Sequence, residues 1–72
     1  MEENKQQILD LLVKTLNKTI RGKDIIDITW NETWQMVNII YLDGYNFEFM
    51  VNIKTGFQLI EEVMRVVKNE RS

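Results

Sequence analysis

The fold is decided by one stretch of sequence, WQMVNIIYLDGYNFEFMVNI, which runs from Trp34 to Ile53. Asp43 and Gly44 lie near its middle, between two runs rich in β-branched and aromatic residues. An Asp-Gly pair in this setting is a strong hairpin signal, because a type I′ turn needs positive φ angles at both central residues. We therefore expect antiparallel strands at residues 34–42 and 45–53, joined by a two-residue turn.

A two-residue turn pairs Leu42 with Tyr45 and so determines which side chains share a face of the hairpin. One of the two faces is almost entirely apolar, and we expect it to be buried. Its members are Trp34, Met36, Asn38, Ile40, Leu42, Tyr45, Phe47, Phe49, Val51 and Ile53. Asn38 is the polar exception, and we expect its amide either to be hydrogen-bonded within the core or to lie where neither helix covers the sheet.

A third strand is expected before this hairpin, at residues 24–30, where β-branched side chains alternate with polar ones. The connection at residues 31–33 is short and pairs the two tryptophans across it. This pairing places Ile26, Ile28 and Trp30 on the same apolar face as the hairpin.

Helices are expected at residues 4–21 and 56–69, because apolar residues recur there at helical spacing. The expected apolar stripes are Ile8, Leu9, Leu12, Val13, Leu16 and Ile20 in the first helix, and Phe57, Ile60, Val63, Met64 and Val67 in the second. Gly22 follows the first helix and suits a left-handed residue after a helix end. Thr55 and Gln58 have the spacing of a capping box at the start of the second helix.

These elements predict one α+β domain, residues 1–72, with the order α-β-β-β-α. The strands form a three-stranded antiparallel meander, and both helices pack on one face of it. A chain of 72 residues is near the lower limit for folding without disulfides or metal ions. The core must therefore be dense, or a partner subunit must help to cover it.

Histidine and cysteine are both absent from the sequence. Their absence removes the commonest general base, the commonest metal ligand and every thiol nucleophile. The glycines do not form a phosphate-binding loop, and no carboxylate pair is placed in a shared pocket. We therefore expect a protein that is not an enzyme and that has no cofactor and no metal site.

The chain begins with an acidic and polar segment rather than with the basic start and apolar stretch of a signal peptide. No apolar run approaches the length that is needed to span a membrane. We therefore expect a cytoplasmic protein that does not associate with membranes.

The second face of the sheet is the first candidate binding surface, because both helices are expected on the opposite face. It combines an apolar centre with a polar rim, as protein interfaces do. The residues proposed for this partner-binding face are Asp27, Val37, Ile39, Tyr41, Glu48 and Met50. We expect a small non-catalytic protein-binding module with a protein partner, and the open edge of the third strand also allows a homodimer.

A cluster of basic residues supports an alternative function. Lys14, Lys18, Arg21 and Lys23 gather around the end of the first expected helix, where they could bind phosphate or offset the helix dipole. The element order resembles that of the double-stranded-RNA-binding domain, which implies nucleic-acid binding. That family also has a lysine-rich start to its second helix, which this chain lacks. With a net charge of −2, nucleic acid is the less favoured partner.

The layout is also similar to that of a small phage-encoded inhibitor of a CRISPR nuclease. This second resemblance implies a regulator or inhibitor of the anti-defence type, of the kind carried by phages and mobile elements. It rests on the order of helices and strands, and no residues are carried over from it.

Overall fold

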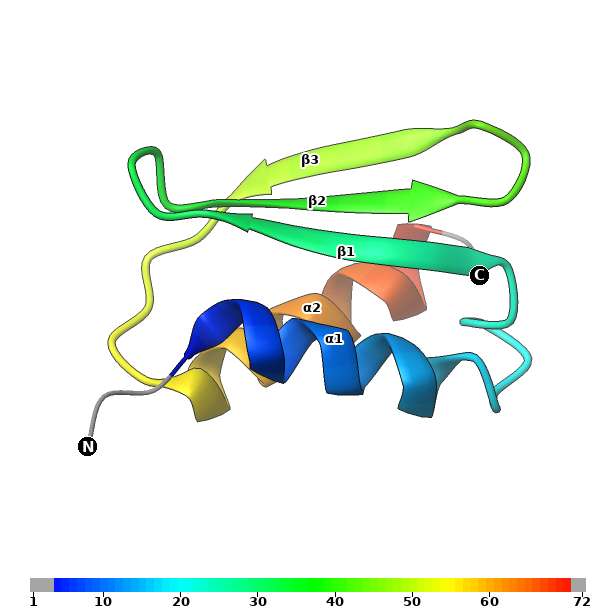
Figure 1. The fold of residues 1–72 in the computed structure, drawn as a ribbon, viewed down its shortest axis with the longest axis horizontal. Helices are drawn as coiled ribbons and strands as arrows, with labels where there is room; N and C mark the ends of the chain where they lie inside the picture. Colours follow the sequence, from blue (N-terminus) through cyan, green and yellow to red (C-terminus); the bar gives the residue numbers. More distant parts are fainter. Residues whose placement is uncertain (1–3, 71–72) are drawn as a thin grey trace.

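The computed structural model describes residues 4–70 of the chain, apart from the side chain of Glu70. The elements follow one another as α1 (Lys5–Leu16), β1 (Ile25–Asn31), β2 (Met36–Tyr41), β3 (Asn46–Met50) and α2 (Gly56–Glu70). The strands form an open antiparallel sheet in the order β1-β2-β3. Both helices lie on one face of this sheet, and α1 contacts β1 and α2 (Figure 1). The expected fold class and packing are confirmed.

Helix α1 is shorter than expected, because it ends at Leu16 instead of extending to residue 21. Asn4 caps its start, where its side-chain oxygen accepts a hydrogen bond from the Gln7 N–H at 3.0 Å. Leu9, Leu12, Val13 and Leu16 are buried as the helical spacing predicts. Ile20, which was expected to continue this stripe, lies in the following loop with 87% of its side chain exposed.

The chain turns back after α1 by a route that the sequence does not indicate. Gly22 does not take the left-handed conformation expected after a helix end. It is instead pressed against Leu16, so closely that a Cβ atom on Gly22 would lie 2.5 Å from the Leu16 carbonyl oxygen. Asn17 holds the same loop, since its amide donates to the carbonyls of Gly22 and Ile25 at 3.0 and 2.7 Å.

The turn between β2 and β3 has three residues and not two. The Tyr41 N–H donates to the Tyr45 carbonyl at 2.8 Å, and the Gly44 N–H donates to the Tyr41 carbonyl at 3.0 Å. Gly44 alone takes the left-handed conformation, with φ of 90°. This is a turn closed by a one-residue bulge, the next commonest solution to the two-residue turn. The expected type I′ turn is therefore wrong.

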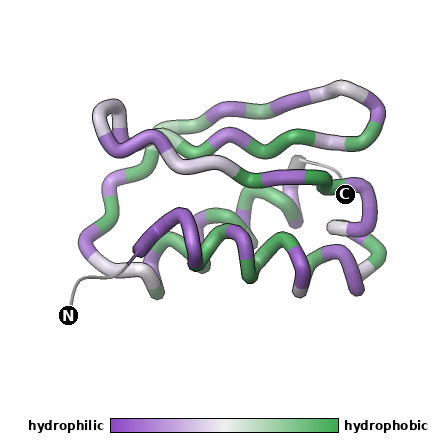
Figure 2. The backbone as a smooth tube through the Cα atoms, viewed as in Figure 1, coloured by the Kyte–Doolittle hydropathy of each residue, from purple (hydrophilic) through white to green (hydrophobic). Residues whose placement is uncertain are grey.

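The longer turn shifts the register by one residue, so β2 presents its other face to the helices. Phe47 now pairs with Ile39, and Phe49 with Val37. Val37, Ile39 and Tyr41 are consequently buried at 0 or 1% exposure, which overturns their expected place on an open surface. The inward face of β3 is as expected, since Phe47 and Phe49 are half-buried against the core. Figure 2 shows hydrophobic and hydrophilic residues alternating along β3.

Several residues that were expected inside the core lie elsewhere for the same reason. Trp34 and Leu42 are exposed in the two turns, at 66 and 72%. Met36, Asn38 and Ile40 lie half-buried on the face of the sheet that carries no helix. Asn38 is therefore not a core amide, although its Oδ1 atom is enclosed and has no hydrogen-bond partner among the described residues.

Strand β1 is only partly as expected, because it contains a bulge between Ile25 and Asp27. The extra residue leaves Ile26 exposed and puts Ile25 into the core, which reverses the expected order. Beyond the bulge the alternation holds, with Ile28 buried and Trp30 half-buried. Trp30 pairs with Val37 rather than with the other tryptophan, since residues 32–35 form a four-residue turn.

Helix α2 begins at the cap that the sequence indicates, although the return bond from Gln58 goes to the residue before Thr55 instead of to Thr55 itself. The Thr55 hydroxyl accepts from the Gln58 N–H at 3.2 Å, and the Gln58 side chain accepts from the Lys54 N–H at 2.7 Å. The buried stripe is rotated from the expected one. Its members are Leu59, Val63, Val66 and Val67, whereas Phe57 and Met64 are exposed at 71 and 51%.

Candidate functional site

The structure divides the six residues proposed for the partner-binding face into two groups. Val37, Ile39 and Tyr41 belong to the core, so they cannot contact a partner. Asp27, Glu48 and Met50 are exposed, but Asp27 lies on β1 while Glu48 and Met50 lie on β3, with β2 between them. The proposed site is therefore not one continuous apolar patch.

The basic cluster is placed around the end of α1. Lys14 lies in the last turn of the helix, and Lys18, Arg21 and Lys23 are exposed in the loop that follows. Arg21 bonds α2 and not α1. Its guanidinium donates to the carbonyl of Lys68 in the last turn of α2 at 2.9 Å. This contact ties the loop to the C-terminal end of α2, where a cation offsets the helix dipole.

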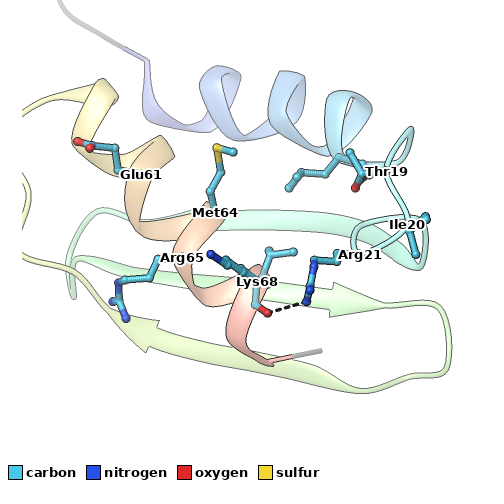
Figure 3. Close-up of a pocket in the computed structure, with 9 residues that line it drawn as sticks. Thr19, Ile20, Arg21, Glu61, Met64, Arg65 and Lys68 are labelled. Atoms are coloured by element: carbon cyan, nitrogen blue, oxygen red, sulfur yellow. Dashed lines mark hydrogen bonds between the residues drawn. The ribbon is translucent and has the colours of Figure 1, made fainter. Parts of the chain in front are cut away.

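A groove lies between this loop and α2, with a volume of about 780 Å³. Its lining residues are Leu16, Thr19, Ile20, Arg21, Glu61, Met64, Arg65, Val67 and Lys68. Leu16 and Val67 are buried, while Ile20 and Met64 stand exposed in the same groove. Figure 3 shows the Met64 side chain pointing from α2 towards α1, with the hydrogen bond from Arg21 to the Lys68 carbonyl near the far end of α2.

The charges around this groove are predominantly positive. Three cations, Arg21, Arg65 and Lys68, line it together with the single carboxylate of Glu61. Arg65 forms an ion pair with Glu62 one turn earlier, at 2.5 Å, so its charge is partly offset. Arg21 and Lys68 have no ion-pair partner among the described side chains, although the chain as a whole carries a net charge of −2. The groove thus has an apolar floor, and near the C-terminal end of α2 it carries the positive charges of Arg21 and Lys68.

The two open edges of the sheet differ in how they are covered. The outward backbone groups of β1 are bonded by α1, since the Gln6 amide accepts from the Trp30 N–H at 2.8 Å and donates to the Ile28 carbonyl at 3.0 Å. Asn17 bonds the Ile25 carbonyl farther along the same edge. Side chains of one helix and its C-cap therefore occupy the position where another strand would pair.

The edge of β3 has no such cover. The Tyr45 carbonyl accepts from Tyr41 at the end of β2, and the Val51 N–H donates to the carbonyl of Gln35 just before β2. Alternation along β3 therefore turns the backbone groups of Asn46, Glu48 and Met50 outward. No hydrogen bond joins those outward groups to any part of the chain between residues 4 and 70.

Sequence reasoning singled out Arg21, Glu48 and Met50, but it did not predict the groove or the cover over the edge of β1. A signal for the groove was present, because α2 carries apolar residues around about half of its circumference and a two-layer fold cannot bury all of them. Met64 was counted as core on helical spacing alone. No local signal marks Gln6 as a residue that bonds a strand 22 to 24 positions away.

Within the described part of the chain, no group of three or more acidic side chains is placed to hold a metal ion. None of the described helices is long and apolar enough to cross a membrane. No family model, curated protein or solved structure matches the chain.

Proposed function

We propose that this protein is a non-catalytic binding module that holds an amphipathic, acidic helix of a protein partner in the groove between α2 and the loop that follows α1. The observation that carries the proposal is the exposure of two apolar residues, Ile20 and Met64, at 87 and 51%, in a groove whose lining also includes the buried Leu16 and Val67. Exposed apolar groups of this kind are typical of surfaces that a partner covers.

Charge complementarity supports the choice of an acidic partner. A helix that lies in an apolar groove presents its apolar residues at positions i, i+3, i+4 and i+7 and keeps its polar face outward. Acidic residues at the margin of such a helix would meet Arg21 and Lys68. Arg21 keeps donors for a carboxylate, since a guanidinium has five N–H groups and the contact with Lys68 is made through Nη1.

This function corresponds to a small regulator or inhibitor that acts by covering a surface of a larger protein. The partner-binding face proposed from the sequence is replaced by the groove, because three of the six residues of that face are in the core. Met50, which remains exposed on β3, serves as a matched control for Met64.

The test uses a fluorescent designed peptide that forms an amphipathic helix with glutamates beside its apolar stripe. Its dissociation constant is measured by anisotropy with the wild-type chain, Met64→Glu and Met50→Glu. We expect Met64→Glu to raise the constant at least about tenfold and Met50→Glu to leave it within about twofold. Equal weakening by both variants, or no binding by the wild type, contradicts the proposal.

The nucleic-acid alternative rests on Lys14, Lys18, Arg21 and Lys23, and a separate titration tests it. Duplex RNA is titrated with the wild-type chain at low and moderate salt, and the same titration is repeated with Lys14→Ser and Lys18→Ser combined. Salt-sensitive RNA binding that these changes weaken, together with no binding of the peptide, would favour the alternative. Our proposal requires that the chain binds the peptide and shows no such binding of RNA.

A further inference from the structure

We infer that the open edge of β3 is a second binding site, which pairs with an extended segment of a partner protein that carries a basic residue between two apolar ones. The inference is independent of the groove, because it rests on different residues in the sheet layer.

The contrast between the two edges of the sheet is its first support. The β1 edge is occupied by the side-chain amide of Gln6, which donates and accepts as a neighbouring strand would. The β3 edge leaves the N–H and carbonyl groups of Asn46, Glu48 and Met50 directed away from the sheet. An unpaired edge of this kind is the template on which an added strand forms its backbone hydrogen bonds.

The side chains along β3 specify the chemistry of that added strand. Phe47 and Phe49 are half-buried on the face towards the helices, with ring centroids 5.8 Å apart. Apolar residues of a paired strand would extend this aromatic surface. Glu48 lies between them on the opposite face and is exposed, so a lysine or arginine of the added strand would lie across from a carboxylate.

The same carboxylate argues against a second copy of the chain as the occupant. The twofold register that uses the outward groups of Asn46, Glu48 and Met50 in both copies centres on Glu48. The two Glu48 carboxylates would then face one another on the same side of the sheet. Like charges directly opposite destabilise a strand pair, whereas a basic residue in that position stabilises it.

The experiment compares two soluble peptides, one of alternating valine and lysine and one of alternating valine and glutamate. Amide hydrogen exchange is followed residue by residue in the wild-type chain, in Glu48→Lys and in Asp24→Lys, which makes the same charge change at an exposed position before β1. We expect the lysine peptide to slow exchange at the amides of Glu48 and Met50 severalfold in the wild type and in Asp24→Lys. Glu48→Lys should lose this effect and respond to the glutamate peptide instead.

A lysine peptide with N-methylated amides at alternate positions separates strand pairing from simple charge attraction, and it should give no protection. Equal protection by the methylated and unmethylated peptides overturns the inference, as does protection confined to β1 or to the helices. Light scattering of the chain alone gives a further check. A dimer that protects the β3 amides without any peptide would show that a second copy occupies the edge, and would also overturn the inference.

Discussion

Gly22 and Leu16 are in direct backbone contact, although six positions separate them in the sequence. A Cβ atom at residue 22 would lie 2.5 Å from the Leu16 carbonyl oxygen and 2.7 Å from its Cβ. This contact turns the chain from the end of α1 towards β1. It also brings residues 19–21 beside α2, where they line the groove.

We predict that Gly22→Ala destabilises the protein by about 1–3 kcal/mol, because the added methyl group meets a backbone that must move to admit it. Urea unfolding followed by tryptophan fluorescence measures the change. The control is Lys23→Ala at the neighbouring exposed position, where a change within about 0.5 kcal/mol is expected. Equal stability of Gly22→Ala and the wild type would show that the close contact is absent in solution.

Ile39 and Ile40 test the register of the β2–β3 hairpin, because they are adjacent and point to opposite faces of the sheet. Ile39 is fully buried and Ile40 is half-buried on the face without helices. Ile39→Val should cost about 0.5–1.5 kcal/mol, while Ile40→Val should remain within about 0.5 kcal/mol. Thermal unfolding of the two variants provides the comparison. A larger loss of stability in Ile40→Val than in Ile39→Val would contradict the observed register and favour a two-residue turn.

Gln6 is the residue that joins α1 to the edge of β1. Gln6→Ala leaves the partly buried Trp30 N–H and Ile28 carbonyl without their partner, so we expect a loss of about 1–3 kcal/mol. Gln7→Ala is the matched control, since the Gln7 side chain is exposed. Hydrogen exchange at the Trp30 amide should accelerate in the Gln6 variant only. Unchanged exchange there would mean that the amide does not cover the strand.

Asn38 offers a prediction in the stabilising direction. Its Oδ1 atom is enclosed on the central strand without a hydrogen-bond partner among the described residues, and asparagine is a poor strand former. Asn38→Val should therefore raise the free energy of unfolding by about 1 kcal/mol. Asn46→Val, at an exposed position on β3, should give a smaller gain. A loss of stability in Asn38→Val would indicate that the amide has a partner in solution.

The sequence by itself determined the kinds of element and their order. Helical spacing of apolar residues marked α1 and α2, alternation marked the strands, and the capping box at Thr55 and Gln58 marked the start of α2. The alternation in β3 also predicted that Phe47 and Phe49 face the helices. These features depend on residues close together in the chain, so local physical chemistry is sufficient to predict them.

Only the tertiary structure decided which faces meet and which surfaces remain open. One residue more in the turn at Asp43 and Gly44 reversed the faces of β2, and one bulge at Ile26 did the same at the start of β1. An Asp-Gly pair is compatible with both turn lengths, and the choice depends on burying Val37, Ile39 and Tyr41 beneath the helices. The groove and the cover over β1 likewise arise from contacts between residues far apart in sequence, which no local pattern encodes.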